Sequence, residues 1–226
     1  MRPKPIGIVG GAGPLAGASL LERILRLASS GYGCTKDADF PQAFLISYPF
    51  SEMLSPALDE AQLRKELRSC LALLRQNGSA VLAIACNTLH AFLDACEEES
   101  DLIHLPRAIA AAIPRNETPL VLCTSTSARF ALHKRFFSCT YPDAQTQNQI
   151  DRIIDQILEG NEQGAIVEDL QRLIEDQTAS TVILGCTELS LLTGHLKSCP
   201  QRIMDPLEIL ARKIVEESFN NTRGRI

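Results

Sequence analysis

The sequence predicts an α/β protein of two similar lobes, and three observations lead to this prediction. Short apolar runs rich in Val, Ile and Leu recur along the chain without polar alternation, which is typical of parallel strands buried on both faces. Segments with helical periodicity lie between these runs, so strands and helices alternate. The stretches VLAIACNTLH (81–90) and VILGCTELSL (182–191) both contain an apolar strand, a cysteine and the start of a helix. This echo predicts one pseudosymmetric lobe in each half of the chain, each with a mainly parallel sheet flanked by helices.

The strand candidates are short and apolar. The four strongest runs contain no charged residue and predict strands over 6–9, 80–85, 119–123 and 181–184. Weaker runs predict further strands over 43–47, 102–105, 139–141 and 202–204.

The predicted helices fill the intervals between these strands. Pro14 suits the first position of a helix because it has no N–H to leave unpaired, and Leu20, Ile24 and Ala28 follow at helical spacing. A second helix is predicted over 56–76, with Asn77-Gly78 as its C-terminal stop. Further periodic segments predict helices over 88–98, 127–137, 147–159, 162–177 and 206–219.

Composition and charge exclude several classes of protein. The 226 residues include 22 Lys and Arg against 27 Asp and Glu, a net charge of -5 without a basic stripe, so we expect no nucleic acid partner. No apolar run approaches the roughly 20 residues that cross a bilayer, so we expect no membrane partner. The apolar run at 6–9 begins too early to leave room for a secretion signal, and we therefore expect a cytoplasmic location.

Eight cysteines are spread along the chain. No pair has CxxC or zinc-ribbon spacing, so the sequence predicts no metal site. A chain of this size has ample core without disulfides, and most of these thiols are interpreted as small buried hydrophobic residues.

Cys86 and Cys186 are distinguished by their position just after predicted strands. Ligands in open α/β sheets bind outside the carboxyl ends of the strands, so two facing lobes would bring both cysteines to one cleft. Each is followed by a predicted helix, whose N-terminus lowers a thiol pKa and attracts anions. The alternative is that each cysteine is a small residue at the end of a strand and that its polar neighbours cap the helix.

Two loops also lie at predicted strand ends. In GIVGGAGPLAG (7–17), Gly11 and Gly13 begin a G-x-G-x-x-A pattern, but Pro14 removes an N–H that a pyrophosphate would need. This loop either binds a nucleotide, forms the wall of a small-anion cleft that includes Gly11, or is a structural turn. The hydroxyls of 124–127, among them Thr124 and Thr126, either cap a helix or bind substrate.

These motifs together resemble the aspartate/glutamate racemase superfamily, specifically its aspartate racemase branch. GIVGGAGP, ACNTLH and LGCTEL carry the resemblance, with support from LCTSTSA, from Pro142 and Gln147, and from Met204-Asp205-Pro206. The motifs occur in the right order and span nearly the whole chain.

The resemblance implies a cofactor-independent amino-acid racemase, in many relatives a homodimer, that acts on a small-molecule amino acid without pyridoxal phosphate. Cys86 and Cys186 would be the paired acid and base on opposite faces of the α-carbon. Asn87, Thr88, Thr126 and Thr187 would bind the substrate's α-carboxylate and amino groups. We expect a first lobe of residues 1–114 plus 205–226 and a second lobe of residues 115–204, with the active site in the cleft between them.

The chain departs from the aspartate racemase pattern in its basic residues. The resemblance implies an arginine just past the second strand that binds an acidic side chain, but residues 37–63 contain no Lys or Arg. Arg152 is a candidate for a second cation, and a solvated helix position is the alternative. The side chain accepted by the enzyme is therefore open. Other hypotheses are an isomerase or hydantoin-type racemase of the same superfamily, a non-catalytic carboxylate-binding module, and a dinucleotide oxidoreductase.

Several further polar residues are interpreted as structural. Glu188 is either a carboxylate in the first turn of a helix or a group that tunes Cys186. His90, His104, His133 and His195 do not cluster in the sequence and are assigned to the core or the surface.

Overall fold

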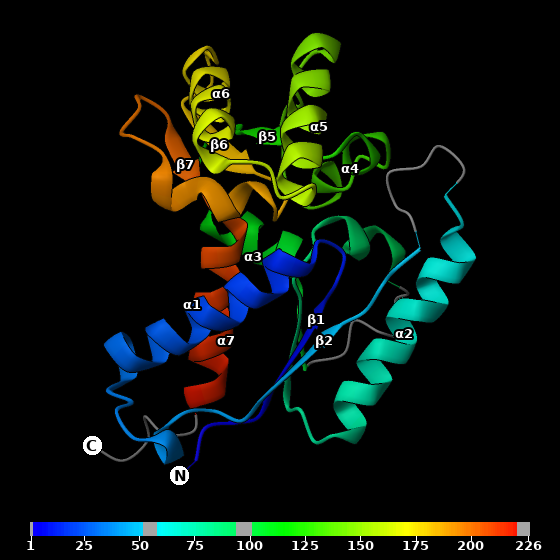
Figure 1. The fold of residues 1–226 in the computed structure, drawn as a ribbon, viewed down its shortest axis with the longest axis vertical. Coiled ribbons are helices and arrows are strands. Elements are labelled where there is room, and N and C mark those ends of the chain that lie inside the picture. Colours follow the sequence, from blue (N-terminus) through cyan, green and yellow to red (C-terminus); the bar gives the residue numbers. More distant parts are fainter. Residues whose placement is uncertain (1, 52–57, 94–100, 221–226) are drawn as a thin grey trace.

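The computed structural model describes residues 2–51, 58–93 and 101–220, and it contains two parallel sheets (Figure 1). The first sheet has four strands in the order β2-β1-β3-β4, and the second has three in the order β5-β6-β7. Every strand pair is parallel. The strands are β1 (Ile6–Gly10), β2 (Ala43–Ser47), β3 (Val81–Ile84), β4 (Leu102–Ile103), β5 (Leu120–Leu122), β6 (Thr181–Leu184) and β7 (Arg202–Met204).

Helices flank both sheets. The α-helices are α1 (Pro14–Tyr32), α2 (Glu60–Gln76), α3 (Leu105–Ala112), α4 (Ser125–Arg129), α5 (Ala144–Leu158), α6 (Gln163–Glu175) and α7 (Pro206–Phe219). In Figure 1, α5 and α6 lie beside the second sheet at the top, whereas α1, α7 and α2 lie around the first sheet below. None of the helices in the described part of the chain has both the length and the apolar character that a bilayer crossing requires.

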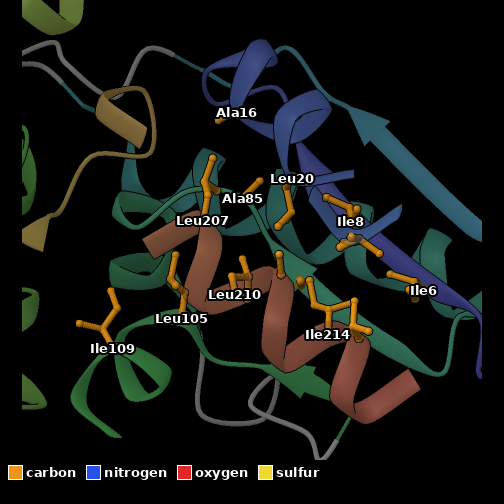
Figure 2. Close-up of a cluster of buried hydrophobic side chains, with 14 of the residues drawn as sticks. Ile6, Ile8, Ala16, Leu20, Ala85, Leu105, Ile109, Leu207, Leu210 and Ile214 are labelled. Carbon is orange, nitrogen blue, oxygen red and sulfur yellow. The ribbon is translucent and has the colours of Figure 1, made fainter. Parts of the chain in front are cut away.

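Three hydrophobic clusters hold these layers together. One packs α2 against the first sheet, and another packs α5 and α6 against the second. The third lies on the other face of the first sheet, where β1 contributes Ile6 and Ile8 and the helices contribute Leu20, Leu105 and Leu210 (Figure 2). This third cluster continues to Val121 and Ile183 of the second sheet, so the two lobes share buried apolar surface.

Helix α7 returns the chain from the second sheet to the first lobe, where it packs against α1 and α3. The Lys4 N–H donates a hydrogen bond of 2.9 Å to the Ser218 carbonyl, which joins the first and last segments of the described chain. The proposed domain boundaries at 114/115 and 204/205 remain a prediction. The two sheets fall on either side of the first boundary, and α7 begins just past the second.

Most predicted elements are confirmed, and the differences have local causes. The predicted strand 139–141 forms only one bridge, from Thr140 to Leu120, because Pro142 has no N–H to extend the ladder. The predicted helix 127–137 is divided into α4 and a short 3-10 turn (His133–Arg135), because Ala131 between them has a left-handed φ of 48°. Leu105, predicted as the end of a strand, instead begins α3.

Three predicted helices differ in type or in length. The helix after Cys86 is a 3-10 helix, η2 (Thr88–Phe92), and the rest of the predicted 88–98 helix lies mostly outside the described residues. The helix after Cys186 is also 3-10, η5 (Leu189–His195). Within its described residues, the predicted helix 56–76 begins at Glu60 after the N-cap Asp59.

Candidate active site

A small cavity lies where strands of the two sheets end. Its volume is about 60 Å³, and both Cys86 and Cys186 line it. Each cysteine lies two residues beyond the end of its strand, β3 or β6, and Thr124 lies two residues beyond β5. Because parallel strands present their carboxyl ends at one edge of a sheet, this spacing brings the side chains together. The lining consists of Ala12, Gly13, Cys86, Asn87, Thr88, Thr124, Ile154, Leu158, Cys186, Thr187 and Glu188.

Burial dominates the environment of Cys86. Its side chain is 6% exposed, and burial, with a smaller contribution from the Glu188 carboxylate, raises its pKa to about 12. Hydrogen bonds from the backbone of η2 act in the opposite direction but are weaker. The sequence-based expectation of a lowered thiol pKa is therefore wrong, because desolvation outweighs the lowering by the short 3-10 helix.

Cys186 has a direct acidic partner. Its thiol donates a hydrogen bond of 2.8 Å to Oε2 of Glu188. Burial and this carboxylate raise the pKa of Cys186 well above the ordinary 9.0, so the expected lowering is wrong here too. Burial also raises the pKa of Glu188 above the ordinary 4.5. Thiol and carboxylate therefore form a buried pair in which the carboxylate is placed to accept the thiol proton.

Further polar groups of the cavity have unused hydrogen-bonding capacity. Asn87 is 1% exposed, and among the described residues neither atom of its side-chain amide has a hydrogen-bond partner. Oε1 of Glu188 also has no hydrogen-bond partner there. Buried polar atoms are normally paired, so these groups are suited to a polar ligand in the cavity.

The threonines differ in how much of their capacity is already used. The Thr88 hydroxyl lies 2.9 Å from the Ser127 hydroxyl and 3.4 Å from the Thr124 hydroxyl. Thr124 also caps α4 by accepting a hydrogen bond from the Ser127 N–H, so it both caps a helix and lines the cavity. The Thr187 hydroxyl lies 3.2 Å from the Ala85 carbonyl oxygen and thereby links the two lobes.

The glycine loop contributes its backbone to the site. Gly13 lines the cavity with a φ of 84°, and a Cβ there would overlap Oε1 of Glu188. Gly11 has a φ of 99° and lies against the backbone of Tyr48, outside the cavity lining. Thr126 lines a neighbouring cavity with Asp151 and Asp155 rather than the cysteine cavity.

The described lining of the cysteine cavity contains no cation. Its apolar part comes from Ala12 and from Ile154 and Leu158 of α5. Arg152, the candidate second cation, is exposed and lines a separate groove between α5 and α6. The cavity therefore offers apolar surface, amide and hydroxyl groups, and one carboxylate.

Cofactor or metal binding finds little support in these side chains. Among the described residues, no three His, Cys, Asp or Glu side chains are grouped so that they would hold a metal ion. The Glu188 carboxylate lies directly against Gly13, where a dinucleotide site would place a negatively charged pyrophosphate.

Sequence reasoning gave too little weight to Glu188 and did not find Ile154 or Leu158. The spacing Cys-x-Glu was a signal for Glu188, because the turn after a strand folds a side chain back onto the residue two positions earlier. Ile154 and Leu158 are four residues apart on α5, so they lie on one face of that helix, but the sequence did not reveal which face meets the cysteines. His90, His104 and His133 are buried and His195 is exposed, which agrees with their predicted assignment to the core or the surface.

Comparison with known proteins assigns this architecture to a family. The chain is 21% identical over 219 residues to the broad specificity amino-acid racemase RacX of Bacillus subtilis (strain 168), covering 93% of this chain and 96% of that protein. An aspartate racemase homologue from Pyrococcus horikoshii OT3 superposes with a TM-score of 0.71 at 25% identity, over 95% of this chain and 99% of that one. The aspartate racemase of Picrophilus torridus superposes with a TM-score of 0.76 at 18% identity, over 95% and 94% of the two chains. Residues 9–214 match the family described as Asp/Glu/Hydantoin racemase, and the chain belongs to this family.

Proposed function

We propose that this protein is a pyridoxal-independent amino-acid racemase that inverts the α-carbon by proton transfer between Cys86 and Cys186. The observation that carries the proposal is that one small cavity receives both thiols, one from the end of each sheet. Inversion requires a proton to leave one face of the carbon and another to arrive at the opposite face, and thiols from two facing lobes meet that requirement. Membership of the Asp/Glu/hydantoin racemase family supports the proposal.

Cys86, Cys186 and Glu188 form the proton-transfer system of the proposed reaction. Burial raises the pKa of both thiols, so in the proposed resting state both are protonated, and we assign the negative charge of the site to Glu188. Transfer of the Cys186 proton to Glu188 along their 2.8 Å hydrogen bond creates the thiolate, which removes the α-proton. Cys86 then gives its proton to the opposite face. The three groups hold two protons before and after this cycle, and Cys86, now a thiolate, is ready for the other enantiomer.

We propose that the polar lining binds the main-chain groups of the substrate. The unpartnered amide of Asn87 offers N–H donors to the α-carboxylate and a carbonyl oxygen to the α-ammonium group. The hydroxyls of Thr88, Thr124 and Thr187 surround the same cavity. In this assignment Gly11 lies outside the cysteine cavity and supports the glycine loop. Thr126 lines the neighbouring cavity and does not contact the substrate directly.

The substrate side chain that we propose is not acidic. A carboxylate needs a cation or several donors to offset its desolvation, and the described lining offers a carboxylate and apolar carbons instead. The sequence supports this, because residues 37–63 contain no Lys or Arg. Neutral amino acids are therefore expected to react faster than aspartate or glutamate.

Deuterium incorporation tests the proposal directly. The purified protein, freed of pyridoxal phosphate, is incubated in heavy water with individual L- and D-amino acids, and α-deuterium and optical rotation are followed. We expect at least one neutral amino acid to exchange and to lose optical activity, and we expect a variant lacking both cysteines to do neither. The racemase proposal is wrong if no amino acid in a broad panel shows exchange or racemisation.

The homodimer and the cytoplasmic location also remain predictions.

A further inference from the structure

We propose that His90 is a positioning residue for Cys86. By hydrogen-bonding to the carbonyl oxygen of Cys86, it fixes the backbone that carries the thiol to the substrate. This inference rests on the proposed racemase function and adds a residue that does not line the cavity.

The hydrogen bonds of His90 define which ring nitrogen carries the proton. The backbone N–H of Leu105 lies 3.2 Å from Nε2 of His90, and because an N–H only donates, Nε2 is the unprotonated acceptor. The proton of a neutral ring is then on Nδ1, which lies 2.8 Å from the Cys86 carbonyl oxygen and donates to it. Both nitrogens of His90 are therefore used, in one defined tautomer.

The surroundings of His90 hold the ring neutral and in place. The side chain is 4% exposed, and its ring meets that of His104 edge to face at a centroid distance of 4.8 Å. The His104 ring lies in turn 4.8 Å from that of Phe136. Burial, together with His104, lowers the pKa of His90 to about 3, so the neutral ring persists at physiological pH.

His90 connects Cys86 to the hydrophobic core. Cys86 lies beyond the end of β3 and before η2, where neither a sheet ladder nor an α-helix fixes its carbonyl group. Leu105 is the first residue of α3, and the side chain of the N-cap residue does not cap this helix. Nε2 of His90 instead accepts a hydrogen bond from the Leu105 N–H, one of the first N–H groups that an α-helix leaves without an internal partner. Through this bond the position of Cys86 depends on a helix whose residues Leu105 and Ile109 are fully buried.

The other half of the chain has no equivalent. The residue four positions after Cys186 is Ser190, which is fully buried and whose hydroxyl has no partner among the described residues. There, Glu188 acts on the sulfur itself. Loss of the His90 hydrogen bond should therefore impair proton transfer at Cys86 and leave the Cys186–Glu188 pair intact.

Two substitutions of His90 separate positioning from stability. His90→Asn retains an N–H donor near the position of Nδ1, and His90→Leu retains bulk without a donor. Both lose the bond to Leu105. Ser190→Ala is the matched control, because Ser190 follows Cys186 by four residues as His90 follows Cys86. The native enzyme is assayed first for exchange in heavy water. Absence of exchange in the native enzyme would contradict the proposed function rather than this inference.

We expect His90→Leu to lower kcat about 10- to 100-fold with little change in KM, because displacement of a reacting group by about 1 Å costs up to about 10²-fold. We expect His90→Asn to be slower than the native enzyme but faster than His90→Leu, because it keeps a donor to the Cys86 carbonyl and loses only the bond to Leu105. The α-deuterium isotope effects on kcat/KM for the two enantiomers should diverge in His90→Leu, because only the Cys86 step slows, and should not diverge in Ser190→Ala.

The inference is overturned if His90→Leu is no slower than Ser190→Ala, if His90→Asn is as slow as His90→Leu, or if the two isotope effects stay as in the native enzyme. Nitrogen-15 NMR of the histidine rings in the native protein provides a test that needs no variant. A proton on Nδ1 of His90 is the expected result, and a proton on Nε2 would overturn the inference even if the variants fail to fold.

Discussion

Replacement of Glu188 by glutamine tests the proposed proton-transfer system most directly. Glutamine has nearly the same shape and can still accept a hydrogen bond from the Cys186 thiol, but it cannot take the proton. In the Glu188→Gln variant the buried Cys186 thiol must therefore lose its proton to water instead of to a neighbouring carboxylate. Burial is the largest cause of the raised pKa of Cys186, and it remains in the variant.

The expected loss is that of a positioned proton acceptor. We expect kcat for Glu188→Gln to fall by about 10²- to 10⁴-fold, which corresponds to about 3 to 5 kcal/mol in the activation free energy. KM should change less than kcat, because Asn87 and the hydroxyls of Thr88 and Thr124 do not contact Glu188 through a hydrogen bond. Glu117→Gln is the control, because Glu117 also accepts a hydrogen bond from a hydroxyl, that of Thr181, but lies outside the cavity lining.

The pH profile gives a second readout. Protonation of Glu188 removes the acceptor, so the native rate should fall as the pH falls through the pKa of this carboxyl, which burial raises above 4.5. In Glu188→Gln this acid limb should disappear, and the rate should rise with pH as the thiol ionises directly. Initial rates of α-deuterium incorporation from both enantiomers measure both effects. A variant within about five-fold of the native rate, with the acid limb unchanged, would refute the proposed role of Glu188.

Three further predictions concern other parts of the molecule. Replacement of either Cys86 or Cys186 by alanine should lower racemisation by at least about 10²-fold, measured by polarimetry, and residual activity near the native level in either variant would exclude a two-thiol mechanism. Leu158→Arg places a cation at the 46% exposed edge of the cavity and should raise kcat/KM for aspartate relative to a neutral amino acid; an unchanged ratio in competition assays would contradict the proposed basis of specificity. Asp101→Asn removes the paired 2.9 Å hydrogen bonds from Arg75 and should lower the free energy of unfolding in urea by about 1 kcal/mol at pH 7. Because these hydrogen bonds hold the pKa of Asp101 below the ordinary 3.8, the difference between native and variant should vanish as the pH falls through the lowered pKa, and a difference that persists there would contradict the assignment.

The fold was largely predictable because most of its strands are buried. Four of the described strands, β1, β3, β5 and β6, are buried at every residue and leave unbroken apolar runs, and 181–184 was predicted with the observed bounds. The less buried strands 43–47 and 202–204 were also predicted with the observed bounds. Helix α3 was not predicted, because only His104 separates it from the two-residue strand β4 and the predicted strand 102–105 extended across that boundary.

The site was predictable where it depends on strand ends, and not where it depends on burial. The convergence of Cys86 and Cys186 followed from their register after β3 and β6. The direction of their pKa shifts did not, because desolvation outweighs the helix N-terminus and depends on tertiary packing. Arg152 illustrates a second limit: it lies two residues from Ile154 on α5, and residues two apart on a helix point to different sides.

The return of α7 to the first lobe has a consequence for biosynthesis. The core between α1 and the first sheet includes Leu207, Leu210 and Ile214, which leave the ribosome after the whole second lobe. During synthesis, the apolar residues of β1 and α1 that pack against α7 therefore stay exposed on that side until the last helix emerges. The two lobes cannot mature as independent units in chain order: the first lobe to be made is the last to be completed.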